Sequence, residues 1–299
     1  MTRALSACLL VACLAPLTRA VDPPKPVDLF AQDNLVAWCI VPFDAKKRSP
    51  AERVEMLQKL GFKKYAYDWR AEHLPTFDEE VTLLKKAKIE LTAVWFPASL
   101  GADAQKLLAV VKKHEVKPQL WITMGEPAGT DQAAKVDAAA KAIKPIAEEA
   151  AKLGCSVALY NHGGWFGEPK NQVAIIEALK LKNVGIVYNQ HHGHDHFDKF
   201  PELLKQMKPH LLALNLNGSV RGGDKVGKKI MPLGTGELDE TLLATIRDSG
   251  YTGPIGILGH TQDDAAERLA DNLDGLKWLL PQLAGKMPGP RPTYRTYKP

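Results

Sequence analysis

Short apolar runs alternate with amphipathic stretches along most of the chain. Eight runs rich in β-branched and aromatic residues cover positions 35–41, 64–69, 90–96, 119–124, 156–161, 184–189, 211–217 and 255–259. The stretches between them carry apolar residues at helical spacing, as at Val54, Leu57 and Leu60. Because strands that alternate with helices build parallel β-α-β units, this pattern predicts an α/β fold with a parallel sheet.

The first connection after a predicted strand helps to choose between an open sheet and a closed barrel. Ser49, Pro50 and Glu52 form the signature of a helix start, so positions 42–48 are expected to be a loop. No glycine-rich phosphate turn follows the first strand, which argues against a dinucleotide-binding sheet and a nucleotide cofactor. With 299 residues in the chain, the prediction is a single (β/α)8 TIM barrel over residues 34–285.

The two ends of the chain differ from this pattern. Residues 1–20 have a positive start and a short apolar run, which predicts a secretory signal peptide cleaved after Ala20 and a periplasmic or extracellular protein. The run is too short to span a membrane, so no transmembrane segment is expected. Two alternatives are a lipoprotein anchored through Cys13 and a structural N-terminal helix. Residues 21–33 are expected to be a linker, and residues 286–299 a solvated or wrapping tail.

The composition of the chain limits the kinds of binding partner to expect. The net charge of +5 comes without a long basic run, so no nucleic-acid partner is expected. Cys39 and Cys155, the two cysteines beyond the signal, lie on non-neighbouring predicted strands and are expected to be buried free thiols. The sequence gives no oligomeric state.

Function in a (β/α)8 barrel lies at the carboxyl ends of the strands. There the sequence combines hydrogen-bonding side chains with tryptophans, the combination that binds a polyhydroxylated ring. We therefore expect a small-molecule carbohydrate as ligand. The predicted substrate-binding residues are Trp95, Asn161, Trp165, Asn189, Asn215, Asn217, Arg221 and His260, whereas Trp38 and Trp121 are expected to pack inside the barrel.

Two turns carry a resemblance to a known family. The segments Asn161-His162-Gly163-Gly164 and Val187-Tyr188-Asn189-Gln190-His191-His192, together with the strand order, resemble the xylose-isomerase-like barrels, which include sugar isomerases and epimerases and endonuclease-four-type proteins. The resemblance spans roughly residues 34–280. The sequence looks most like an exported bacterial subgroup of that family. It implies a (β/α)8 barrel that acts on sugars.

The resemblance also implies a divalent metal held by Glu, Asp, His and Glu after strands five to eight. Here the matching positions carry Tyr160, Asn189, Asn215 and either Gly259 or His260. Neutral amides bind hard cations poorly and are not general bases, so the family's two-glutamate proton transfer does not carry over. What matches the family is His162 and His192, both expected near the ligand.

Other residues could supply the missing chemistry. Glu126 ends the fourth strand and, with His162, is the predicted acid-base pair; the alternative is that Glu126 caps a helix or forms a loop salt bridge. Four histidines fall within positions 191–196, and one hypothesis is a zinc or manganese ion held by Glu126, His162 and His192. Alternatively, these histidines form hydrogen bonds to substrate hydroxyls, or they are structural residues of the loop. The basic loop that contains Arg221 is expected to be solvated or to bind an anionic substrate.

Three function classes remain open. The favoured one is an exported sugar isomerase, epimerase or keto-sugar lyase that moves a proton next to a carbonyl. A catalytically inactive carbohydrate-binding barrel is the second, since the family's acids are replaced. A glycoside hydrolase that uses Glu126 with Glu168 or Asp68 is the third.

Overall fold

A computed structural model describes residues 28–298. The predicted signal peptide and most of the predicted linker therefore lie outside the described residues. Eight parallel strands close into one barrel in sequence order, so the predicted fold is confirmed. The strands are β1 Leu35–Trp38, β2 Lys64–Tyr67, β3 Glu90–Phe96, β4 Gln119–Ile122, β5 Ser156–Tyr160, β6 Val184–Asn189, β7 Leu211–Leu216 and β8 Ile255–Leu258.

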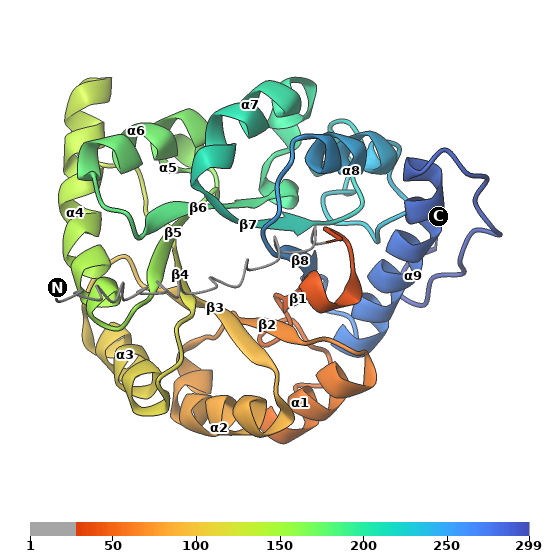
Figure 1. Cartoon of the computed structure of the whole chain (residues 1–299), viewed down its shortest axis with the longest axis horizontal. Coiled ribbons are helices and arrows are strands. Elements are labelled where there is room, and N and C mark those ends of the chain that lie inside the picture. The colour runs from red at the N-terminus through yellow and green to blue at the C-terminus, as the bar shows by residue number, and fades with distance from the viewer. Residues whose placement is uncertain (1–27, 299) are drawn as a thin grey trace, which may run out of the picture.

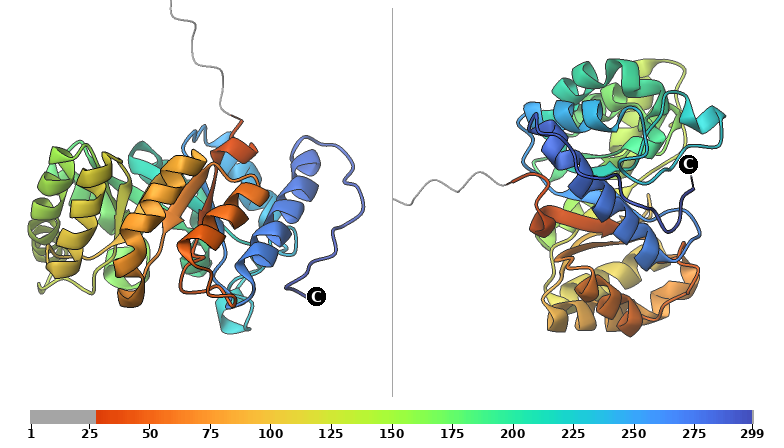
Figure 2. Two further views of the ribbon diagram at one scale, coloured as in Figure 1. Left: turned by 90° about the horizontal axis from the view of Figure 1, so that it is seen from below. Right: turned by 90° about the vertical axis from the view of Figure 1, so that its right-hand side faces the viewer.

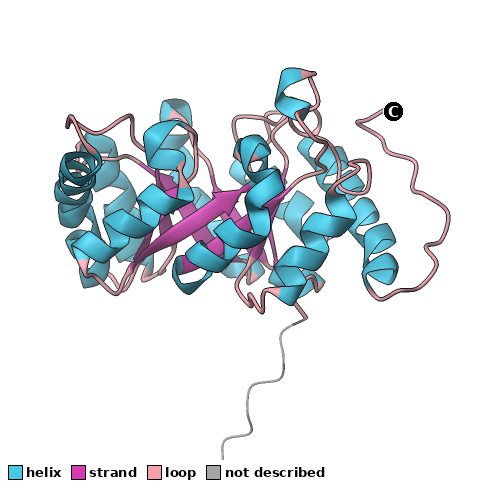
Figure 3. Ribbon diagram, turned by 90° about the horizontal axis from the view of Figure 1, so that it is seen from above, coloured by secondary structure: helices cyan, strands magenta, loops and turns pink. Residues whose placement is uncertain are grey.

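The helices form a ring around the strands (Figure 1; Figure 3). They are α1 Pro50–Lys59, α2 Phe77–Ala87, α3 Ala102–His114, α4 Gln132–Lys152, α5 Gly164–Gly167, α6 Pro169–Leu179, α7 Phe200–Met207, α8 Asp239–Asp248 and α9 Ala265–Leu283. The predicted start of α1 is confirmed, because Ser49 and Glu52 form a reciprocal capping box with Pro50 in the first helical turn. No helix within residues 28–298 is both long enough and apolar enough to cross a bilayer.

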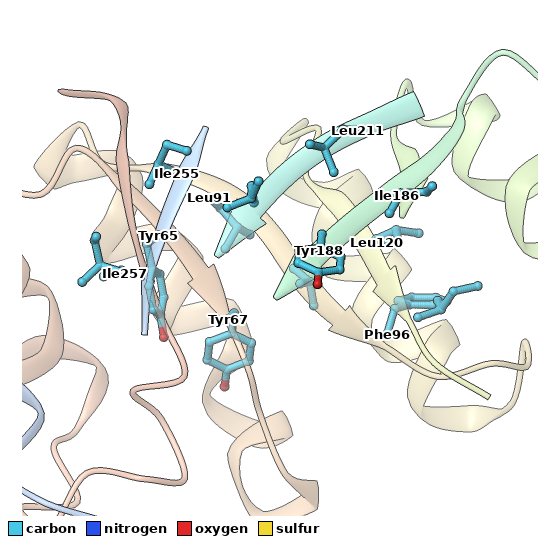
Figure 4. Packing of buried hydrophobic residues seen from close by; sticks show 14 of the residues in the cluster. Tyr65, Tyr67, Leu91, Phe96, Leu120, Ile186, Tyr188, Leu211, Ile255 and Ile257 are labelled. Carbon is cyan, nitrogen blue, oxygen red and sulfur yellow. The ribbon is translucent and has the colours of Figure 1, made fainter. Parts of the chain in front are cut away.

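The main core lies between the strands and the helices. Outward-facing strand residues such as Tyr65, Phe96 and Ile186 are buried in this layer (Figure 4). Burial of apolar area there supplies most of the stability of the barrel, at roughly 25 cal/mol for each Å² removed from water.

The inside of the barrel is filled by aromatic rings beside small residues. Trp38 and Trp121 are fully buried with ring centroids 4.6 Å apart, which confirms that both pack inside the barrel. Alanines on neighbouring strands, including Ala66 and Ala93, leave room for these rings. These rings fill the interior of the barrel, so the space for a ligand lies at the carboxyl ends of the strands.

Both ends of the described chain pack against the barrel. Leu29 and Phe30 are buried, and the amide of Asn34 donates to the backbone oxygens of Leu29 and Gly253, so residues 28–33 are packed chain rather than free linker. The tail after α9 loops outward and returns along the helix (Figure 2). Its Arg295 and Thr296 bind the buried carboxylate of Asp271, so the tail wraps the barrel.

Candidate functional site

A pocket opens at the carboxyl ends of the strands. Its wall consists of four aromatic side chains, four imidazoles, and the side chains of Cys39, Asp68 and Arg70; the aromatic residues are Trp38, Phe43, Trp95 and Tyr160, and the imidazoles belong to His162, His191, His192 and His260. A larger groove of about 640 Å³ lies between α7 and α8, but only helix-surface residues line it. The convergence of strand-end side chains marks the smaller pocket, of about 60 Å³, as the candidate site.

Asp68 supplies the one carboxyl group among the described residues that line this pocket. It follows β2, and its Oδ1 accepts hydrogen bonds from the backbone N–H groups of Ile40 and Val41 at 3.2 and 3.1 Å. Its Oδ2 is buried and has no hydrogen-bond partner within residues 28–298. Burial raises the pKa of Asp68 to about 6, against the opposing effects of the Val41 N–H and the Arg70 charge. Such a carboxyl group can both accept and return a proton near neutral pH.

The turn after β1 creates this arrangement. Cys39 has a φ of +58°, the left-handed region that non-glycine residues rarely adopt. This turn presents the next two N–H groups to Asp68. The Cys39 thiol is buried and unpaired, as predicted, and burial raises its pKa well above the usual value, so it is a neutral neighbour of the carboxylate rather than a nucleophile. Cys155 is likewise a buried free thiol, as predicted.

The four imidazoles form a connected group in the same pocket. Ring centroids lie 4.3 Å apart for His162 and His192, 3.6 Å for His191 and His192, and 5.8 Å for His191 and His260. Burial lowers the pKa of each ring, to about 4 for His260, and the charge of Lys229 adds to this effect. Neutral imidazoles offer one donor and one acceptor each, so at neutral pH the group is suited to bind hydroxyl and carbonyl oxygens.

Trp95 and His260 lie where the sequence predicts them, on the pocket wall. The Trp95 ring meets Tyr160 edge-on at 5.2 Å and lies 5.8 Å from His162. His260 packs against Phe43 with ring centroids 3.5 Å apart. Aromatic rings and imidazoles therefore pack against each other in the pocket wall.

Asn161 and Asn189 hold two strands together instead of facing the ligand. The Asn161 side chain donates to the backbone oxygen of Asn189 at 3.0 Å and accepts from its N–H at 2.7 Å. The Asn189 side chain donates to the Tyr160 hydroxyl and accepts from the His191 N–H. Both amides are buried and occupied, so the prediction that they bind substrate is not supported by their geometry.

Asn215 and Asn217 are buried and lie outside the pocket lining. The amide of Asn215 fills the space beside Gly256, and neither its nitrogen nor its oxygen has a partner in the described chain. Asn217 donates to the backbone oxygen of Gly218 and shapes the turn after β7. Neither residue belongs to the pocket lining, so both are placed in the interior rather than at the predicted binding surface.

Three further predicted residues lie away from the pocket. Glu126 is exposed and its carboxylate pairs with Lys135 at 2.5 Å, so the loop salt bridge was the correct alternative. Trp165 donates to Gln132 in a separate surface depression. Arg221 is exposed on the loop after β7 and pairs with Asp198. Glu126 lies outside the pocket for a local reason. Because β4 ends at Ile122, Glu126 comes four residues after the strand, and its side chain turns towards α4.

The predicted metal set of Glu126, His162 and His192 is not brought together, because Glu126 is bound to Lys135 outside the pocket. The positions that match the family's metal ligands do not replace it, since the Asn189 amide is occupied and the Tyr160 hydroxyl, whose pKa is raised well above the usual value by burial, is neutral. No group of three His, Cys, Asp or Glu side chains within residues 28–298 has an arrangement suited to an ion. The residues present do not fit the metal that the resemblance implies.

Sequence reasoning missed the most important residue pair of the pocket. Asp68 and Arg70 follow β2 directly and are among the polar strand-end groups of the sequence, but the sequence singles out Asp68 by name only as an option for a hydrolase. Its burial and its contacts with Ile40 and Val41 depend on the turn at Cys39, which no spacing rule reveals. A hydrolase with two carboxyl groups is disfavoured, because Asp68 has no second carboxyl beside it in the lining.

Comparison with known proteins agrees with this architecture. Residues 54–281 match the family of xylose isomerase-like TIM barrels, and the chain belongs to that family. A comparison with curated protein sequences gives no significant match.

Many solved structures share the fold. The 3-keto-D-glucoside 4-epimerase YcjR from E. coli is 14% identical with a TM-score of 0.62, over 83% of this chain and 99% of that chain. An L-ribulose 3-epimerase is 11% identical with a TM-score of 0.64, over 85% and 96% of the two chains. The probable 3-DHS dehydratase AsbF from Bacillus anthracis is 17% identical with a TM-score of 0.63, over 81% and 98%. At these identities the likeness establishes the fold.

Proposed function

We propose that this protein is a carbohydrate-modifying enzyme that transfers a proton at a carbon next to a carbonyl group, as sugar isomerases and epimerases do. The observation that carries the proposal is the Asp68 carboxyl group, which is buried in the pocket, has one free oxygen and has a pKa raised to about 6. Family membership and the epimerases among the similar structures support a sugar-type substrate.

The pocket offers a role for each group in such a reaction. Asp68 Oδ2 takes the proton from the carbon, the C–H electron pair forms a carbon-carbon double bond, and the carbonyl oxygen gains negative charge. A neutral imidazole N–H from His162 or His192 stabilises that oxygen, because a donor aimed at a developing charge lowers the barrier in a poorly solvated site. Return of the proton from Asp68 to a carbon of the intermediate completes the reaction and regenerates the carboxylate.

The remaining wall holds the substrate. Trp95 gives an apolar face for the C–H side of a sugar ring, while His191 and His260 offer donors and acceptors to hydroxyl groups. Glu126, the carboxylate favoured by sequence, has no part in this proposal.

The test is hydrogen exchange with solvent. The purified protein is incubated in D2O with a panel of aldoses, ketoses and keto-sugars, and NMR follows deuterium at the carbon next to the carbonyl. We expect exchange with at least one member of the panel and its loss in Asp68→Asn. Exchange that persists in Asp68→Asn would overturn the assignment of Asp68.

A catalytically inactive carbohydrate-binding barrel is the second candidate. The observation that favours it is that the positions of the family's acidic ligands carry Tyr160, Asn189 and either Gly259 or His260 here, and that Tyr160 and Asn189 are buried. Sugar binding by calorimetry without exchange for any substrate, in the wild type as in Asp68→Asn, would establish this candidate in place of the enzyme.

Export is also proposed, on the sequence of residues 1–20 alone. Cell fractionation with N-terminal sequencing tests it: a mature protein that begins at Val21 supports a cleaved signal. A lipid-modified Cys13 supports the lipoprotein alternative, and retention of Met1 in the cytoplasm contradicts both.

A further inference from the structure

Arg70 places its positively charged guanidinium group, a fork of parallel N–H donors, in the pocket wall together with Asp68, the proposed acid-base group. Its Nη1 donates to the backbone oxygens of Asp68 and Trp69 at 3.1 and 2.8 Å, which fixes the guanidinium group against the end of β2. The same group lies over the Phe43 ring at 5.3 Å. The side chain is thus held in place from two sides although the residue is exposed.

This fork has no acidic partner of its own. No carboxylate of residues 28–298 lies within ion-pair distance of Arg70, and its Nε and Nη2 atoms make no hydrogen bond to that part of the chain. Arg48, Arg53 and Arg295 instead bind carboxylates. A fixed arginine with two unused donors in a pocket wall is suited to an anion supplied from outside.

The charges around the pocket agree with an anionic ligand. The Arg70 charge lowers the pKa of Asp68, His162 and His260, so it acts on the carboxyl group and on two of the four imidazoles. The Lys229 charge also lowers the pKa of His162 and His260. Asp68 is the single acidic side chain of the described lining, so two positive charges act on a pocket that holds one negative charge.

We propose that the substrate of this pocket carries a carboxylate, as in a sugar acid or keto-sugar acid, and that Arg70 binds it through Nε and Nη2. Two parallel N–H groups of one guanidinium match the two oxygens of a carboxylate. A phosphate would need further cations or several backbone N–H groups around it, and Arg70 is the single cationic side chain in the described lining. The inference rests on the proposed function because it assigns the substrate class of the same pocket.

The test compares two probes that differ in one group. Calorimetry measures binding of D-glucuronate and of D-glucuronamide, the neutral amide of the same sugar, to the wild-type protein at low salt. We expect glucuronate to bind about 10- to 100-fold more tightly, as a charge-assisted bidentate contact implies, and its affinity to fall as salt is added. Equal affinity for the two probes, or no binding of glucuronate, would overturn the inference.

Variants locate the contact. Arg70→Gln should abolish the preference for glucuronate, and Arg70→Lys should retain only part of it, because an ammonium group keeps the charge without the fork. The matched control is Lys225→Gln, which removes one positive charge from the exposed loop after β7, where Lys225 lies 3.6 Å from Asp195. A preference that persists in Arg70→Gln, or that Lys225→Gln abolishes to the same degree, would contradict the assignment.

Two further measurements separate the outcomes. The first compares inorganic phosphate and acetate as competitors of bound glucuronate. If phosphate displaces glucuronate more strongly than acetate does, the substrate group is a phosphate and the proposed carboxylate is wrong. Exchange activity on a neutral sugar, with no preference for glucuronate, would leave the proposed function intact and reject this inference. Tight binding of glucuronate without exchange on any sugar acid would support the carboxylate site and reject the proposed proton transfer.

Discussion

Asp68 and Glu126 both follow a barrel strand, yet their surroundings differ in every respect that matters for chemistry. Asp68 comes one residue after β2, is buried, and receives two backbone N–H groups from another loop. Glu126 comes four residues after β4, is exposed, and pairs with Lys135. The distance from the strand end therefore decides whether each of these two carboxyl groups lies inside the barrel mouth or in the surrounding loop.

The largest expected effect is on catalysis. Asp68→Asn keeps the size of the side chain and an oxygen for the Ile40 and Val41 N–H groups, but it cannot accept a proton. We expect the rate of solvent exchange to fall about 10²- to 10⁴-fold, the usual contribution of a general base. Glu126→Gln is the matched control and should stay within about two-fold of wild type, by the same argument. Equal losses in the two variants would remove the distinction.

The pH dependence of the rate should carry the signature of Asp68. Because its carboxyl group must be ionised to take a proton and its pKa is about 6, the rate should fall about ten-fold for each pH unit below 6 and level off above it. His260, with a pKa lowered to about 4, stays neutral over most of this range. Stopped assays across pH 4.5 to 8 check the profile, and Glu126→Gln should leave it unchanged. An inflection near the ordinary carboxylate value of about 4 would contradict the burial argument.

Stability should depend on pH through the same group. The pKa of Asp68 is about 6 in the folded state and 3.8 as its ordinary value, so the folded state binds more protons between these values. Folding stability contributed by Asp68 is therefore lost as pH rises from about 4 to above 6, by up to about 3 kcal/mol. Asp68→Asn removes this loss, so the stability of the variant relative to wild type should increase between pH 4 and pH 7.

Urea unfolding at the two pH values measures this difference. Glu126→Gln, which changes an exposed carboxylate outside the pocket, is the control in the same experiment. A constant difference between Asp68→Asn and wild type across this pH range would show that burial does not raise the pKa of Asp68.

The turn at Cys39 offers a smaller test. Because the left-handed conformation disfavours a side chain branched at Cβ, Cys39→Val should be less stable than Cys39→Ala by about 1 to 2 kcal/mol. The strained turn also carries the N–H groups that hold Asp68, so Cys39→Val should lose exchange activity as well. Thermal unfolding and exchange assays measure the two effects. Equal stability and activity of the two variants would show that the turn does not position the carboxylate.

The smallest effect on the free energy of unfolding is expected at the exposed salt bridge between Glu126 and Lys135. Glu126→Gln or Lys135→Gln removes a surface salt bridge, which typically contributes about 0 to 1 kcal/mol. Urea unfolding should show a change within this range. A loss of several kcal/mol would mean that Glu126 has a structural role that its exposure does not suggest.

The strands were predictable because local pattern decides them. β3 and β6 begin and end where the apolar runs do, and in the other strands only the last residues differ, since the final residues of each run leave the sheet to form the loop. The buried state of Cys39 and Cys155 and the packing of Trp38 and Trp121 followed from the same periodicity. Such features depend on which residues are apolar and how they are spaced, and the sequence contains both.

The site was only partly predictable. His162, His192, Trp95 and His260 converge as expected, because neighbouring strands bring their ends to one mouth. Asn161 and Asn189 look like ligand-binding amides in the sequence, but the Asn161 side chain binds the backbone of Asn189. The Asn189 side chain in turn binds the Tyr160 hydroxyl and the His191 N–H. Sequence shows that an amide is present, whereas the partner that occupies it is set by strands 28 residues apart.

By itself, the sequence determined the class of this protein: a closed barrel of eight β-α units with aromatic rings inside and polar groups at one end. The tertiary structure alone decided which of the two carboxyl groups, Asp68 or Glu126, is buried in the pocket. The pKa of Asp68 depends on its burial and on N–H groups supplied by a turn at Cys39, almost thirty positions earlier. Glu126 has neither, because its side chain is exposed and pairs with Lys135 outside the pocket. Residue type is a local property, but the solvation and charge that give a carboxyl group its chemistry come from the whole fold.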